Sequence, residues 1–115
     1  MSQEVTIVDE QTAKDGKLLA ILSHFWILGT IIAWILNLSK KNEYAAFYIR
    51  QMIGLQVLGF LVEGIIVYIL GGFIAKILGI ALFVLWLISL FGAFSDKLKL
   101  IPVVGAYFQK IFRSL

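Results

Sequence analysis

The chain has 115 residues, of which 61% are hydrophobic and 15% charged, and its formal net charge is +3. Soluble globular domains are about 45–50% apolar, so this composition predicts an integral membrane protein and argues against a soluble enzyme. The sequence has no Cys, which excludes disulfides, thiolate metal sites and thiol nucleophiles. Its basic residues flank apolar runs, a pattern that favours membrane orientation over nucleic-acid binding.

Residues 1–16 form a polar, acidic N-terminal leader that has little apolar surface to bury. A signal peptide would have a basic start, a short apolar core and a small-residue cleavage site, none of which this leader provides. We therefore expect the apolar run that follows to stay in the mature protein.

That run, residues 18–38, contains 21 residues. A helix of this length spans about 31 Å, enough for a hydrocarbon core of about 30 Å, so it is the first predicted transmembrane helix. A polar loop follows, and then a segment in which Tyr44, Tyr48 and Gln51 recur at helical spacing. We expect an interfacial helical turn there, with the tyrosine rings at headgroup depth.

The apolar stretch from 53 to 94 is too long for one crossing and is interrupted by Gly71 and Gly72, the strongest breaker pair in the chain. Two further transmembrane helices are predicted, over about 52–70 and 74–94, with Lys76 at the outer mouth of the last. The expected fold is therefore all-α, an integral membrane domain of three transmembrane helices over residues 17–95.

The last segment, 96–115, is predicted to be an amphipathic tail that lies on the membrane surface. Pro102 should prevent a continuous helix from the third span into this tail. The two amphipathic segments together supply the expected membrane-surface anchors, which are Tyr44, Tyr48, Arg50, Tyr107, Phe108, Lys110, Phe112 and Arg113.

One carboxylate, Glu63, falls about eleven residues into the predicted second span. An acidic side chain near the membrane centre costs about 2.5–3.5 kcal/mol on insertion scales, so Glu63 should be protonated or have a partner. One hypothesis is a proton or ion relay that uses Glu63 and His24. The other is hydrogen bonding between helices, within or between protomers.

Further polar side chains form a stripe along each of the first two spans, because they recur at helical spacing. The two stripes are expected to face each other, and no cation is expected at the depth of Glu63. The predicted intramembrane polar contacts between helices involve Ser23, His24, Thr30, Asn37, Gln56 and Glu63.

No catalytic or cofactor site is predicted. A single His and a single embedded carboxylate are too few ligands for a metal or haem within one protomer. No Ser/His/Asp arrangement, phosphate-binding loop or carboxylate pair is recognised. We therefore predict a protein that is not an enzyme, with no metal and no cofactor.

Three segments carry a family resemblance, namely LLAILSHFWILGTIIAWILNLSKK, FYIRQMIGLQ and IPVVGAYFQKIF. In these segments the chain resembles the bacterial Tic20-like proteins, also described as the domain of unknown function DUF4870. The resemblance covers nearly all of the chain after the leader and implies a small bacterial inner-membrane protein. The name of the family derives from similarity to a chloroplast protein-import component.

The predicted function is that of an accessory protein or subunit of a larger membrane assembly, in protein translocation or envelope biogenesis. The alternative is a small homo-oligomeric channel or transporter with a polar pathway around Glu63. The expected partners are the lipid bilayer and either another membrane protein or further copies of the chain, with no nucleic acid.

The predicted location is the cell inner (plasma) membrane, as a multi-pass protein. Short loops rich in Lys and Arg tend to remain cytoplasmic. An outside N-terminus and a cytoplasmic C-terminus would place seven of the ten basic residues inside, leaving Lys14, Lys17 and Lys76 outside.

Overall fold

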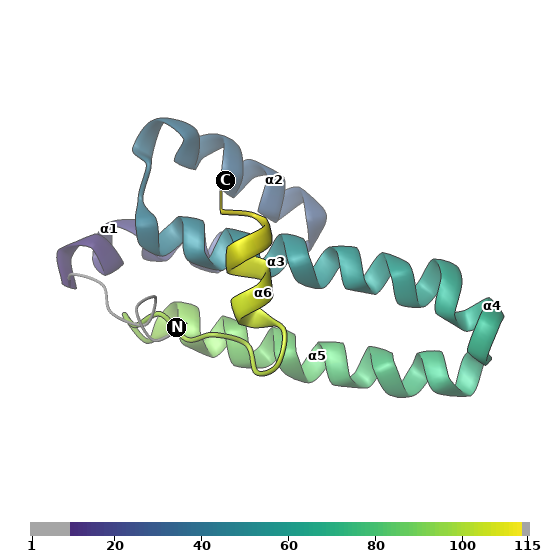
Figure 1. Cartoon of the computed structure of the whole chain (residues 1–115). Helices are drawn as coiled ribbons and strands as arrows, with labels where there is room; N and C mark the ends of the chain where they lie inside the picture. Colours follow the sequence, from purple (N-terminus) through teal and green to yellow (C-terminus); the bar gives the residue numbers. More distant parts are fainter. Residues whose placement is uncertain (1–9, 114–115) are drawn as a thin grey trace.

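Helices form most of the computed structural model, which describes residues 10–113 and contains no strand in that range (Figure 1). Residues 1–9, the first part of the predicted leader, lie outside the described residues. In chain order the elements are α1 (Glu10–Leu22), α2 (Trp26–Lys40), α3 (Glu43–Leu61), the π-helical segment η2 (Val62–Ile66), α4 (Val67–Leu70), α5 (Gly72–Phe94) and α6 (Gly105–Ile111).

Two long helical stretches form the axis of the molecule. One is the continuous run α3–η2–α4 with 28 residues, and the other is α5 with 23 residues. Both are long and apolar enough to cross a membrane, and only 17% of the most apolar 18-residue window of each is buried. They run antiparallel and meet at Gly71, whose φ of 94° is a conformation that glycine adopts without strain (Figure 1). The predicted spans over 52–70 and 74–94 correspond to these two stretches.

The predicted single helix over 18–38 is not present. The chain breaks at Ser23–Phe25, so the run is divided between α1 and α2, and α1 already begins at Glu10 inside the predicted leader. Figure 1 shows α2 folding back over α3 after the break. The two helices are 13 and 15 residues long, too short for a straight crossing that needs about 20 residues. The first apolar run therefore forms a helical hairpin.

The break is built from local hydrogen bonds and tertiary packing. The hydroxyl of Ser23 donates to the carbonyl of Ala20 at 2.7 Å, and Trp26 adopts a positive φ of 64°, which an L-residue rarely does. Gly29 lies against the end of α1, where any Cβ would overlap the carbonyl of Leu22. A side chain at Gly29 would therefore prevent α2 from turning so close to α1.

The two free ends of the hairpin lie together at one end of the molecule. The Lys40 Nζ donates to the carbonyl of Asp15 at 2.8 Å, so the end of α2 touches the first half of α1. The ion pair between Lys17 and Asp96, at 2.7 Å, brings the end of α5 to the same place. The starts of α1 and α3 and the ends of α2 and α5 therefore share one end, whereas the sequence prediction placed the segments before and after residues 18–38 on opposite sides.

The tail returns to the middle of the bundle. After α5 the chain turns back over α5 as a non-helical segment, and α6 then runs across α3 (Figure 1). Phe108 is buried there with Met52 and Leu55 of α3 and Ile101 of the preceding turn. Pro102 lies in the segment between α5 and α6, where the sequence prediction had the helix end.

Candidate functional site

A fully buried polar cluster surrounds the hydroxyl of Ser89 on α5. The Gln51 Nε2 donates to this hydroxyl at 2.9 Å, and the His24 Nε2 lies 2.7 Å from it. The other ring nitrogen of His24 is 2.7 Å from the carbonyl of Ala20. Since a carbonyl only accepts, a neutral His24 donates from Nδ1 and accepts the Ser89 proton at Nε2. The Gln51 Oε1 accepts from the backbone N–H of Ile101 at 2.8 Å, which completes the network.

This cluster contains a serine and histidine in hydrogen bond, a pairing that nucleophilic catalysis uses. Its surroundings favour a structural role. Ser89 is 0% and His24 1% exposed, and the Ser89 oxygen already accepts from Gln51. A substrate therefore has no access to the hydroxyl, and the network ties the hairpin tip, α3, α5 and the tail together. The sequence analysis placed Gln51 on an interfacial turn and gave Ser89 no role, because each is a single polar residue in a separate apolar helix.

Tyr44 and Tyr48 differ from their predicted role as membrane-surface anchors. Both are 0% exposed. The Tyr44 hydroxyl donates to the carbonyl of Ala93 at 2.7 Å, and the Tyr48 hydroxyl donates to the carbonyl of Lys97 at 2.7 Å. The Tyr48 oxygen also accepts from the Lys99 N–H at 3.0 Å. Their rings are interior because the hairpin and α5 enclose this face of α3. Their hydroxyls satisfy free backbone groups in the last turn of α5 and in the segment that follows it.

The polar residues of the hairpin bond to one another and to α3. The Thr30 hydroxyl donates to the carbonyl of Ser23 at 2.6 Å and accepts from the Gln56 Nε2 at 2.7 Å, which joins α2 to α3. The Asn37 side chain bonds both backbone groups of Asn42, with distances of 3.1 and 3.0 Å. Five of the six residues predicted to make polar contacts thus lie at the hairpin or face it.

Arg50 holds the end of α6 against α3. Its guanidinium donates to the carbonyls of Phe112 at 3.2 Å and Arg113 at 3.1 Å, and to the Gln109 Oε1 at 3.3 Å. A cation suits this end of a helix because the last carbonyls are unpaired and carry partial negative charge. The predicted anchor Arg50 therefore anchors the tail to the protein.

The predicted anchors in the tail divide between protein and surface. Phe108 is buried against Gly54, where a Cβ would overlap the ring. Tyr107, Lys110 and Arg113 are exposed, and Phe112 is partly buried. Phe108, and Phe112 in part, thus pack the tail on the bundle, while Tyr107, Lys110 and Arg113 form an exposed aromatic and basic face.

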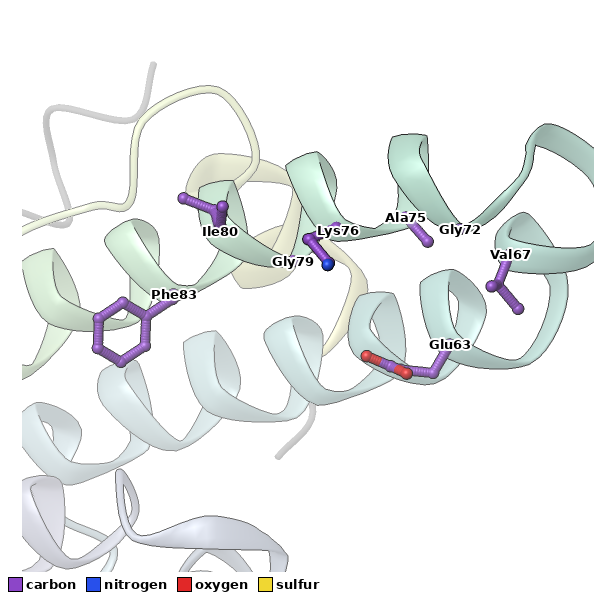
Figure 2. A pocket seen from close by; sticks show the side chains of 8 residues that line it. All are labelled: Glu63, Val67, Gly72, Ala75, Lys76, Gly79, Ile80 and Phe83. Atoms are coloured by element: carbon purple, nitrogen blue, oxygen red, sulfur yellow. The ribbon is translucent and has the colours of Figure 1, made fainter.

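Glu63 lies apart from all of these residues, on the opposite half of the molecule. It shares a hollow of about 440 Å³ with Lys76, between the run η2–α4 and α5 (Figure 2). We call this the Glu63–Lys76 groove. Its other lining residues are Val67, Gly72, Ala75, Gly79, Ile80 and Phe83.

Two charged side chains of opposite sign therefore flank one groove. Figure 2 shows Glu63 on the helix below the groove and Lys76 on α5 above it. Both side chains are exposed, and neither makes a hydrogen bond or ion pair with another residue in 10–113. The expectation that no cation lies near the depth of Glu63 is wrong, because the turn at Gly71 brings Lys76 into the same groove.

Glu63 belongs to the π-helical segment η2. Such segments are rare and occur often at functional sites, since they add a residue to a turn and re-aim the neighbouring side chains. The π-helical segment η2 at Glu63 is therefore a reason to regard the Glu63–Lys76 groove as the candidate functional site. The described residues hold no group of three or more His, Cys, Asp or Glu side chains that could bind a metal ion.

Comparison with family models, with curated proteins and with solved structures gives no match for this chain.

Proposed function

We propose that this chain is a non-enzymatic integral membrane protein that serves as an accessory protein or subunit of a larger membrane assembly. The Glu63–Lys76 groove is the surface through which the chain packs against a protein neighbour in that assembly. The resemblance to the Tic20-like proteins makes an assembly for protein translocation or envelope biogenesis, in a bacterial inner membrane, the first one to examine.

The observation that carries this proposal is the exposure of Glu63 and Lys76 within two long apolar helices. Each charge costs about 2.5–3.5 kcal/mol near the centre of a membrane, and less toward its edge. Contact with lipid chains leaves that cost uncompensated. A neighbouring protein segment with polar groups supplies partners, so protein is a better occupant of the groove than lipid.

The proposal includes a topology in which α3–η2–α4 and α5 cross the membrane and the α1–α2 hairpin enters and leaves from one side. Of the ten Lys and Arg residues, all within residues 10–113, only Lys76 is close to the Gly71 turn. The other nine belong to segments that contact the opposite end or the tail. Short basic segments stay cytoplasmic, so both ends of the described chain are assigned to the cytoplasm.

Single cysteines test this topology, because the chain has none of its own. Gln11, Ser39 and Gly72, each exposed, are replaced one at a time by Cys and probed with an impermeant thiol reagent in intact spheroplasts. We expect labelling of Gly72→Cys alone, and of the other two only after permeabilisation. Labelling of Gln11→Cys but not Ser39→Cys in intact cells would instead support three crossings with an outside N-terminus.

The rival function is a homo-oligomeric channel or transporter lined by Glu63, Gln56, Thr30 and Asn37. In the structure Gln56 donates to Thr30, and Asn37 bonds Asn42. The Glu63–Lys76 groove adjoins the hollow that Gln56 lines, through Gly79 and Phe83, but Asn37 lines a separate hollow beside Arg50. This separation favours the subunit proposal over a shared polar pathway.

Photocrosslinking from the groove tests the function. A photoreactive amino acid at Ile80 should give a defined protein adduct in native membranes, and one at Leu28, on the exposed face of α2, should give lipid adducts. Gly79→Leu should abolish the protein adduct by filling the groove, whereas the control Gly64→Leu should not. A Cβ at either glycine meets no atom within 4 Å, so both variants should fold. Equal adducts from Ile80 and Leu28 would refute the proposal.

A further inference from the structure

We propose that the occupant of the Glu63–Lys76 groove is a second copy of this chain. The two copies pack groove to groove about a two-fold axis, with Glu63 of each copy paired with Lys76 of the other. This inference rests on the proposed function, in which the groove is covered by protein, and it names the protein that covers it.

Self-complementary charge is the first observation that supports a second copy. In a two-fold interface, residue i of one copy meets residue j of the other, and the reverse contact follows by symmetry. A surface that carries one acid and one base can therefore form two identical ion pairs with itself. Neither Glu63 nor Lys76 is satisfied within the described part of its own chain.

The depths of the two charges are the second observation. Two copies inserted in the same orientation can be related only by an axis along the membrane normal, so each residue must find its partner near its own depth. Glu63 is eight residues before Gly71 and Lys76 is five residues after it. At about 1.5 Å per residue these positions lie roughly 12 and 8 Å from the turn, a difference smaller than one helical turn. A flexible lysine side chain spans that difference.

The glycines of the groove are the third observation. Gly54 and Gly92 are required within the chain, since a Cβ on either would overlap a neighbouring aromatic side chain. A Cβ on Gly72 or Gly79 meets no atom within 4 Å. These two glycines have no packing role in one copy, and with Ala75 they fall on one face of α5 at i, i+3 and i+7. Small residues on a face allow the backbones of two membrane helices to approach closely.

Charge reversal distinguishes pairing between copies from pairing within one copy. Each of Glu63→Lys and Lys76→Glu places like charges opposite each other in its own homodimer. Mixed with each other, the two variants restore both ion pairs in a heterodimer. If residues 63 and 76 instead paired within one chain, each variant would keep two like charges close together in its own chain. Mixing the two variants would then not restore association.

The experiment reconstitutes the full chain in liposomes, with donor-labelled and acceptor-labelled copies, and measures association by energy transfer. We expect the wild type to associate, each reversal variant to associate at least tenfold more weakly, and the mixture of the two variants to recover most of the wild-type value. The control Lys14→Glu, at an exposed position of α1 at the other end of the molecule, should associate like the wild type. A mixture no better than the separate variants would overturn the inference.

A second measurement covers the case in which the reversed charges prevent insertion. Gly79→Cys in the otherwise native, cysteine-free chain should form a homodimer with a short bifunctional thiol reagent in membranes, and Leu28→Cys should not. Absence of the Gly79→Cys dimer would overturn the inference. A photoadduct from Ile80 whose mass corresponds to a different protein would also overturn the inference of a second copy, but would support the proposed function. Absence of any protein adduct from Ile80 would refute both the inference and the proposed function.

Discussion

The docking of the tail on α3 makes a sharp prediction at two glycines of one helix. Gly54 and Gly59 both lie in α3, five residues apart. A Cβ at Gly54 would overlap the ring of Phe108, whereas a Cβ at Gly59 would meet no atom within 4 Å. Replacing each glycine by alanine therefore makes the same chemical change at two sites that differ in whether α6 lies against them.

The magnitudes follow from two opposing effects. Gly→Ala in a helix stabilises by about 0.4–1 kcal/mol, chiefly because the unfolded chain loses conformational freedom. Inserting a methyl group into a packed contact costs about 1–3 kcal/mol. Gly59→Ala should therefore raise the free energy of unfolding by about 0.4–1 kcal/mol. The free energy of unfolding of Gly54→Ala should be about 1–3 kcal/mol lower than that of Gly59→Ala.

The assay is unfolding of the purified protein in mixed micelles by increasing mole fraction of a denaturing detergent, followed by circular dichroism. Limited proteolysis of the tail, run in parallel, should show faster cleavage near α6 in Gly54→Ala only. Shortening Phe108 to Ala should cost less in the Gly54→Ala background than in the wild type, because the overlap is then relieved. Equal stabilities for Gly54→Ala and Gly59→Ala would show that α6 does not pack on α3.

Two further predictions concern polar contacts, and both are measured in the same unfolding assay. Ser89→Ala should lower the free energy of unfolding by about 1–3 kcal/mol, because the buried side chains of His24 and Gln51 lose a hydrogen-bond partner. The control Ser39→Ala, at an exposed hydroxyl, should change the free energy of unfolding by less than about 0.5 kcal/mol. Similar effects of the two variants would contradict the buried network. Lys17→Ala should lower the free energy of unfolding by at most about 1 kcal/mol, and by less in high salt, since the Lys17–Asp96 pair is partly exposed. A larger decrease that does not depend on salt would count against this description of the pair.

The two long helices and the turn between them could be predicted from the sequence. A long apolar stretch interrupted by Gly71 and Gly72 has few other solutions, since glycine alone takes up the positive φ seen at Gly71 without strain. Pro102 lies in the non-helical segment between α5 and α6, as the sequence analysis expected. These features depend on the residues at the site itself, so no knowledge of distant contacts was needed.

The hairpin could not be predicted, because nothing in its local sequence ends a helix. The run from 18 to 38 is apolar, and the break contains neither Gly nor Pro. The turn depends on distant contacts, including the bond of His24 to Ser89 and that of Trp86 to the carbonyl of His24. A strained φ at Trp26 is tolerated only where such packing holds it.

The environment of Glu63 was mispredicted for a related reason. The helical wheel grouped Glu63 with Gln56 and directed both toward the first apolar run. Gln56 does bond Thr30 of α2. Glu63 does not reach α2, because α2 begins only at Trp26 and because η2 changes the helical period at Glu63, so that its side chain leaves the face that Gln56 shares. A count of residues on either side of Gly71 would have brought Lys76 to within one helical turn of the depth of Glu63, because the two residues are five and eight positions from the turn.

The hairpin also determines how much of this protein each side of a membrane would encounter. In the proposed topology, the two long helices cross the membrane and the loop between α2 and α3 stays in the cytoplasm. The only described connection to cross would be the turn at Gly71. An antibody, protease or toxin on that side would meet little more than two glycines and the ends of α4 and α5, while nearly every loop and basic residue would face the cytoplasm. Molecules outside the cell would therefore have access to very little of the described part of this protein.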